Sequence, residues 1–110
     1  MGTQNSYTVV LERNTTWQNE FQTEPYETSW AREAIFFIRA LGDGGGARVS
    51  VQISPDGIHW CNEGSSFEVP VTEDSVTFCR VKHFGGWLRL TGTTEDTPTA
   101  PVIVYLSLKE

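Results

Sequence analysis

The sequence predicts an all-β protein folded as a single antiparallel β-sandwich of seven to eight short strands. Residues 48–53 alternate Val49, Val51 and Ile53 with polar side chains, which is the two-residue period of a strand with one wet face. Ser-Pro-Asp-Gly follows at residues 54–57, where proline presets one corner of a turn and glycine accepts positive φ. Turn signals recur about every ten residues, and short strands at this spacing are typical of sandwiches and small barrels.

The mainly apolar run at residues 33–41 is expected to be a central strand. Ile-Phe-Phe-Ile at residues 35–38 favours a strand buried on both faces, and a helix of the same length is the alternative. The glycine-rich segment 42–46 indicates a flexible turn. The runs 33–41 and 48–53 are therefore expected to pair as an antiparallel hairpin.

Further strands are predicted where apolar and polar residues alternate between turn signals. They cover residues 6–12, 58–61, 67–71, 76–82, 87–91 and 102–108, and a short one is allowed near 17–21. Pro70 cannot donate a ladder hydrogen bond, so the strand at 67–71 is expected at a sheet edge. Residues 62–66 and 92–101 are expected to be loops.

A chain of 110 residues suits one domain with a modest core. Residues 1–32 comprise the first strand and a polar connecting segment that contains scattered aromatic side chains. Residues 33–110 form the body of the sandwich. The connecting segment is expected to pack on this body or on a neighbouring subunit.

The net charge limits the partners that the chain can attract. It is −6 at pH 7, with a pI near 4.8, whereas nucleic acids and anionic membranes attract clustered Lys and Arg. No apolar run approaches the roughly 18 residues of a membrane helix, and no secretion signal is visible. We therefore expect no nucleic acid or membrane partner, and a location in the cytoplasm or in a virion. Residues 1–6 also match the short N-myristoylation pattern, which often occurs by accident.

The order of the elements resembles a group of small β-sandwich proteins from phage virions, prophage regions and uncharacterised bacterial genes. The shared pattern is an apolar strand, a glycine-rich turn, an alternating strand that ends in S-x-D-G-x-x-W, an aromatic-apolar-Arg-apolar strand and a final alternating strand. These elements correspond to residues 34–41, 42–46, 49–60, 87–90 and 102–108. The resemblance covers about residues 33–108 and leaves out the first 30. It implies a jelly-roll-like fold and a non-enzymatic role in decoration, tail structure or assembly.

Residues suited to catalysis are sparse. His59 and His83 lie beside turns, and no nucleophile motif such as G-x-S-x-G accompanies them. Cys61 and Cys79 fit no zinc spacing and are expected to be free thiols, with one disulfide as the alternative. We expect no catalytic residues, no metal and no cofactor. Calcium bound by acidic loops is the alternative, with oxygen ligands from Asp43, Asp56, Glu63, Glu73, Asp74, Glu95 and Asp96.

The candidate interaction residues are aromatic side chains of the N-terminal segment: Trp17, Phe21, Tyr26 and Trp30. They stand singly in polar sequence, which favours anchoring of this segment onto the domain or onto a neighbouring subunit. Exposed platforms that stack on sugar rings are the alternative. Trp60 and Trp87 are expected to pack in the core.

The sequence thus predicts a non-enzymatic structural or assembly module. Its expected partner is protein, either copies of itself as a homo-oligomer or a larger particle such as a virion or a phage-like assembly. A carbohydrate- or ligand-binding module that uses exposed aromatics and acidic loops is the second hypothesis, with a glycan as partner.

Overall fold

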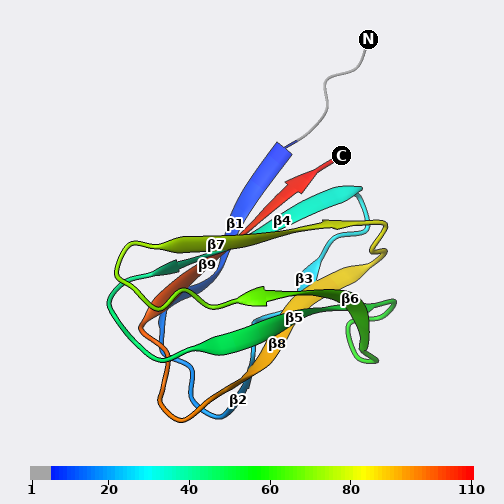
Figure 1. The fold of residues 1–110 in the computed structure, drawn as a ribbon. Coiled ribbons are helices and arrows are strands. Elements are labelled where there is room, and N and C mark those ends of the chain that lie inside the picture. The colour runs from blue at the N-terminus through cyan, green and yellow to red at the C-terminus, as the bar shows by residue number, and fades with distance from the viewer. Residues whose placement is uncertain (1–5) are drawn as a thin grey trace.

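In the computed structural model, which describes residues 6–110, the chain forms nine β-strands in two stacked antiparallel sheets (Figure 1). Sheet A has the order β1-β9-β4-β7, and sheet B has the order β2-β8-β5-β6, with the short β3 also paired to β8. The strands are β1 Ser6–Thr15, β2 Glu20–Gln22, β3 Tyr26–Glu27, β4 Glu33–Ala40, β5 Ala47–Ser54, β6 Cys61–Glu68, β7 Val76–Lys82, β8 Trp87–Thr94 and β9 Val102–Lys109. The expectation of an all-β, jelly-roll-like antiparallel sandwich is confirmed.

The core fills the space between the two sheets. Along β4 every second side chain, from Ala34 to Ala40, is buried, so this run is a central strand and not a helix. The expected burial on both faces is wrong, because the alternate side chains Ile35 and Phe37 lie half-buried on the outer face of sheet A. The inward positions of β9 and of the facing strands β5 and β8 are also almost fully buried: Val102, Val104, Leu106, Leu108, Val49, Val51, Leu88 and Leu90. Burying one such side chain contributes roughly 1.5–3 kcal/mol, so this layer is the main source of the sandwich's stability.

The glycine-rich segment at residues 42–46 crosses from sheet A to sheet B. The strands on either side of it, β4 and β5, lie in different sheets, so the predicted hairpin between them is wrong. The Gly44 N–H donates to the Val71 carbonyl at 3.0 Å and the Gly45 N–H to the Pro98 carbonyl at 2.9 Å. A Cβ at Gly44 would overlap the backbone of Ala100. Glycine is thus needed for the close approach of three loops, rather than for flexibility.

Strands β5 and β6 form the hairpin that the alternating run predicted, but its turn is longer. The Asp56 carboxylate accepts hydrogen bonds from the Ile58 and His59 N–H groups at 2.9 and 2.8 Å, which organises the turn over residues 55–60. The strand expected to begin at residue 58 therefore begins at Cys61.

The segment at residues 62–66, predicted as a loop, lies inside β6. Its side chains are short or polar, which hid the strand from a reading based on apolar alternation. The strand predicted at residues 67–71 was expected at a sheet edge because of Pro70. Strand β6 is indeed an edge strand of sheet B, but it ends at Glu68, so Pro70 lies just beyond it. The loop predicted at residues 92–101 begins only after Thr94, because β8 is longer than expected.

The first three strands, within residues 6–27, contribute to both sheets. β1 pairs with β9 from Ser6 opposite Lys109 to Thr15 opposite Val102, so the described chain ends lie side by side (Figure 1). β2 and β3 pair with β8 in sheet B. With these two short strands, residues 6–110 form nine strands, compared with the seven or eight expected. The myristoylation pattern begins outside the described residues, and residues 6–110 contain no helix long and apolar enough to span a membrane.

Candidate functional site

The outer face of sheet A carries an apolar row that is exposed at its two ends and half-buried at its centre. The strand registers place Val10 beside Tyr105, Tyr105 beside Phe37, and Phe37 beside Phe78, so the row crosses all four strands. Phe78 is 49% exposed, and Val76, two residues earlier on the same face, is 51% exposed. We call the whole outer face of sheet A, which this row crosses, the apolar face. Contiguous apolar surface of this kind is typical of an interaction site, whereas single exposed apolar residues are not.

Basic side chains surround the apolar row. Alternation along the strands places Arg39, Arg80, Lys82 and Lys109 on the same face, which is four of the eight Lys and Arg residues in the chain. The Arg80 guanidinium lies 5.0 Å from the centre of the Phe78 ring. Two of the four have an acidic neighbour, with Arg39 at 3.3 Å from Asp74 and Lys82 at 3.9 Å from Glu33. The apolar face is therefore positively charged in a protein whose net charge is −6.

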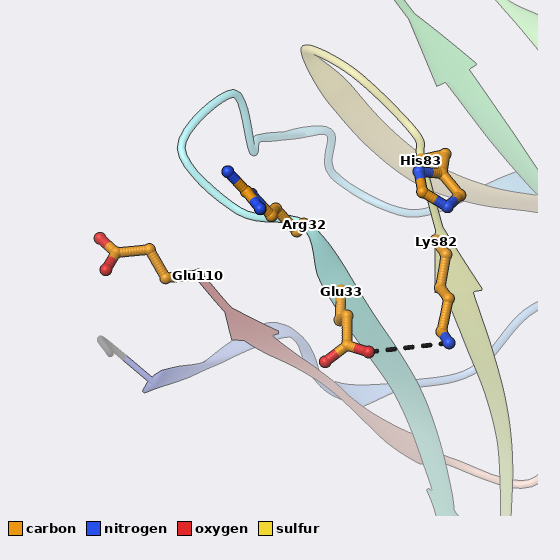
Figure 2. A pocket seen from close by; sticks show the side chains of 5 residues that line it. All are labelled: Arg32, Glu33, Lys82, His83 and Glu110. Carbon is orange, nitrogen blue, oxygen red and sulfur yellow. Dashed lines mark ion pairs between the residues drawn. The ribbon is translucent and has the colours of Figure 1, made fainter. Parts of the chain in front are cut away.

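A charged hollow of about 680 Å³ lies at the end of sheet A where the chain ends meet (Figure 2). It is lined by Arg32, Glu33, Lys82, His83 and Glu110. Figure 2 shows the Lys82 ammonium and the Glu33 carboxylate directed toward each other across neighbouring strands. Exposed ion pairs of this kind contribute little stability. The hollow is a charged border of the apolar face.

The outer face of sheet B is polar. The Arg89 Nε–H donates to the Gln52 amide oxygen at 2.8 Å, and the Gln52 amide nitrogen donates to the Asn62 amide oxygen at 3.1 Å. The Arg89 guanidinium lies 4.2 Å from the centre of the Trp60 ring, a cation–π contact. Burial lowers the pKa of Arg89, since the charged form has lost part of its hydration. We call the surface formed by these four residues the polar face.

Trp60 and Trp87 are not core residues, contrary to the sequence prediction. Both are half-buried on the sheet B side, Trp60 against Arg89 and Trp87 against the turn at Gly57. A Cβ at Gly57, whose φ is +78°, would lie 3.0 Å from the Trp87 ring. The S-x-D-G-x-x-W segment thus directs its tryptophan toward the outer face of the sheet and not into the core.

The turn in the same segment contains a Ser, an Asp and a His, but in an arrangement that does not activate a nucleophile. Asp56 lies 2.7 Å from His59 Nδ1, while the Ser54 hydroxyl donates to the Asp56 carboxylate at 3.0 Å and has no bond to the imidazole. Hydrogen bonds from the His59 backbone, the His59 ring and the Ile58 backbone hold the pKa of Asp56 well below its usual range. These contacts build the turn.

Three loops form an acidic end of the sandwich. The segments 42–46, 71–75 and 95–101 carry Asp43, Glu73, Asp74, Glu95 and Asp96 and contain no Lys or Arg. We call this surface the acidic end. Within residues 6–110, no group of three or more His, Cys, Asp or Glu side chains is placed to hold a metal ion.

The four aromatic residues predicted to interact are placed differently from one another. Trp17 is 4% exposed and stacks on Phe21, with ring centres 4.2 Å apart and an interplanar angle of 6°. Phe21 and Tyr26 are half-buried against the core. Trp30 is 37% exposed. Trp17 is therefore a core residue with no surface for a partner, and Trp30 alone of the four is open to contact.

Sequence reasoning missed the apolar face. A signal for it exists in residues 76–82, where Val76 and Phe78 share one side of the strand, but Cys79 and Val81 occupy the other side. With apolar residues on both sides, the alternation does not reveal which side faces the core. The pairing register with β4 was needed to decide.

Comparison with known proteins assigns the chain to a family. Residues 27–109 match a family described as Domain of unknown function (DUF6385). The chain belongs to this family. The matched region includes all of strands β4 to β9. No curated protein sequence matches the chain.

Solved structures of similar fold include a prophage-derived protein, an exported protein and a CBM domain of a xylanase. The SPBc2 prophage-derived protein YomS has a TM-score of 0.65 and 8% identity, with 100% of this chain and 97% of that chain covered. The PBSX exported protein XepA has a TM-score of 0.59 and 10% identity over 97% of this chain and 37% of that one. The CBM36-1 domain of a multidomain xylanase from the hindgut metagenome of Trinervitermes trinervoides has a TM-score of 0.55 and 16% identity over 94% and 96% of the two chains. At these identities the similarity is one of fold.

Proposed function

We propose that the domain is a non-enzymatic assembly module that associates with further copies of itself through the apolar face. The observation that carries this proposal is the row of Val10, Tyr105, Phe37 and Phe78, which crosses the whole of sheet A and is exposed at its two ends and half-buried at its centre. Water in contact with such a row is released when a partner covers it, and this release favours association.

The size of the face supports the proposal. Four strands spaced by about 4.8 Å and eight residues long at about 3.3 Å per residue give a footprint of about 500 Å². This is of the same order as the roughly 800 Å² per partner that a standard interface buries. A footprint somewhat below that value favours an assembly held by many weak contacts over one tight pair.

A phage-like particle is the setting that we propose for this association. The full-length fold similarity to the prophage-derived protein YomS supports it, as does the sequence resemblance carried by the S-x-D-G-x-x-W hairpin. The protein would then reside in a virion or in a related assembly, with other protein subunits as its partners.

The test is the native mass of the purified protein and of one pair of variants. Phe78→Asp places a charge at the exposed β7 end of the apolar row and should shift the protein to the monomer. Ile58→Asp is the matched control, because Ile58 is 74% exposed but lies in the β5–β6 turn, away from this face. Equal masses for wild type and Phe78→Asp would refute the proposal.

A carbohydrate-binding module is the second candidate, favoured by the polar face. There, the amide groups of Gln52 and Asn62 and the Arg89 guanidinium offer hydrogen-bond donors beside the half-buried Trp60 ring, a combination suited to a sugar. The fold similarity to the CBM36-1 domain supports this candidate. Retardation of the protein in native gels that contain xylan, lost in Trp60→Ala and kept in Trp30→Ala, would favour it, and no retardation by a panel of soluble polysaccharides would exclude it.

A further inference from the structure

The charged side chains of this protein are separated between two surfaces. The apolar face carries four basic residues and Glu33, with Glu110 and Asp74 at its border. The loop segments of the acidic end carry five carboxylates and no Lys or Arg, and one of these carboxylates, Asp74, pairs with Arg39 where the two surfaces meet. The whole chain has a net charge of −6, so the positive apolar face is a local exception. A positive face of this kind favours contact with a negatively charged surface of a partner.

Each of the two surfaces combines its charge with an apolar centre. On the acidic end, Val71 is exposed, and its carbonyl accepts the hydrogen bond from Gly44. On the apolar face, the row through Phe37 and Phe78 lies among Arg39, Arg80 and Lys82. An apolar projection bordered by carboxylates therefore matches an apolar row bordered by cations.

The acidic end is also organised before any partner arrives. The Glu73 N–H donates to the Asp43 carboxylate at 2.9 Å, and the Glu95 N–H donates to the Gly46 carbonyl at 3.3 Å. These bonds join the three loops to one another, in addition to the bonds of Gly44 and Gly45. A surface that is already ordered loses little conformational entropy when it binds.

We propose that the copies associate head to tail, with the acidic end of one copy seated on the apolar face of the next. The inference rests on the proposed function, since it specifies which surface of the second copy covers the apolar face. Face-to-face pairing would instead bring two faces of net positive charge together, and like charges across an interface are unfavourable. A head-to-tail contact uses two different surfaces, so it repeats from copy to copy and gives a ring or an open filament rather than a closed dimer.

Two variants, each defective in one surface, test this arrangement by native mass measurement. Phe78→Asp alters the apolar face and leaves the acidic end intact. Glu73→Lys with Asp96→Lys reverses charge on the acidic end at two exposed side chains and leaves the face intact. Each variant alone should be monomeric. An equimolar mixture should form a 1:1 dimer and nothing larger, because one working surface remains on each chain.

The controls separate this inference from the proposed function. Glu24→Lys with Glu27→Lys makes the same change of charge at exposed residues in and beside β3, which pairs with Leu88 and Trp87 away from the three loops, and this variant should assemble as wild type does. Raising NaCl from about 0.1 M to about 1 M should weaken wild-type association, since it shortens the screening length to about 3 Å. Val76→Asp is a second face variant in case Phe78→Asp does not fold, as judged by far-UV circular dichroism.

Each outcome either supports or overturns the head-to-tail contact. A wild type that stays monomeric would refute the proposed function and this inference together. A wild type that assembles, with the acidic-end variant assembling equally well, would leave the proposed function standing and refute the head-to-tail contact alone. A mixture of the two defective variants that remains monomeric would refute it as well.

Discussion

Replacing Trp17 with alanine should destabilise the domain strongly, although the sequence marks this residue as a candidate for interaction. The side chain is 4% exposed and stacks on Phe21 at 4.2 Å. Its backbone is held to the loop before β9, since the Thr99 N–H donates to the Trp17 carbonyl at 3.0 Å and the Trp17 N–H donates to the Thr99 hydroxyl at 3.0 Å. Truncation would leave a cavity that these bonds prevent from collapsing.

The expected loss is about 3–5 kcal/mol of unfolding free energy, the usual range for a buried Trp→Ala change. For a domain of this size, 1 kcal/mol corresponds to roughly 4 °C in Tm, so Tm should fall by about 12–20 °C. Urea denaturation followed by tryptophan fluorescence measures the free energy, and calorimetry measures the Tm. Trp30→Ala is the matched control and should lose less than about 1 kcal/mol because its side chain is 37% exposed. The reasoning is refuted if Trp17→Ala loses less than about 1 kcal/mol, or if the two variants lose equal amounts.

Three further predictions concern the turn, the crossing loop and the thiols. Because the pKa of Asp56 is lowered in the folded state, its ionised carboxylate stabilises the fold at pH values above the ordinary aspartate pKa of 3.8, and this contribution is lost as the pH falls toward the folded-state pKa. In acid denaturation, wild type should therefore lose its stability advantage over Asp56→Asn below about pH 4. An advantage that does not depend on pH would contradict this. Gly44→Ala should destabilise the domain by roughly 1–3 kcal/mol, because the added Cβ would overlap the backbone of the facing loop. Gly46→Ala is the control: the nearest atoms to its added Cβ lie at 3.9 Å, so its stability in the same denaturation assay should change by less than about 0.5 kcal/mol. Iodoacetamide followed by mass spectrometry should modify the exposed Cys61 before Cys79, because burial raises the pKa of the Cys79 thiol; the reverse order would contradict the structure.

The fold class and the central strands were predictable because their side chains alternate cleanly. Residues 102–108 place Val102, Val104, Leu106 and Leu108 on one side, and all four are fully buried in β9. In such a strand the local pattern and the tertiary environment agree, so a single sequence suffices. The run at residues 33–41 was also found as a central strand, but its expected burial on both faces was wrong, because its consecutive apolar residues do not show that Ile35 and Phe37 face outward.

The sheet assignment could not be predicted from the same signals. The glycine-rich segment at residues 42–46 has the composition of a hairpin turn, yet it carries the chain from one sheet to the other. Its glycines are needed by the approach of two other loops, at residues 71–75 and 95–101, which are distant in the sequence. No local pattern contains that information.

The apolar face was missed for a related reason, although the packing of Trp17, Phe21 and Tyr26 agrees with the expected anchoring of the N-terminal segment on the domain. Tryptophans draw attention in a sequence, but Trp17 is in the core, while Trp60 lies on the outer face of sheet B beside Arg89. The apolar face depends on Val10, Phe37 and Phe78 lying in one row, and these residues come from three strands that are far apart in the chain. Only the register of the sheet brings them together.

Sedimentation equilibrium of the wild-type protein over a range of concentrations tests the central claim most directly. If the apolar face binds further copies, the weight-average mass should rise above that of the 12.3 kDa monomer as concentration increases, and it should pass the mass of a dimer. A mass that stays at 12.3 kDa up to about 1 mM would contradict the account. It would mean a Kd above about 1 mM, which corresponds to a binding free energy weaker than about −4 kcal/mol.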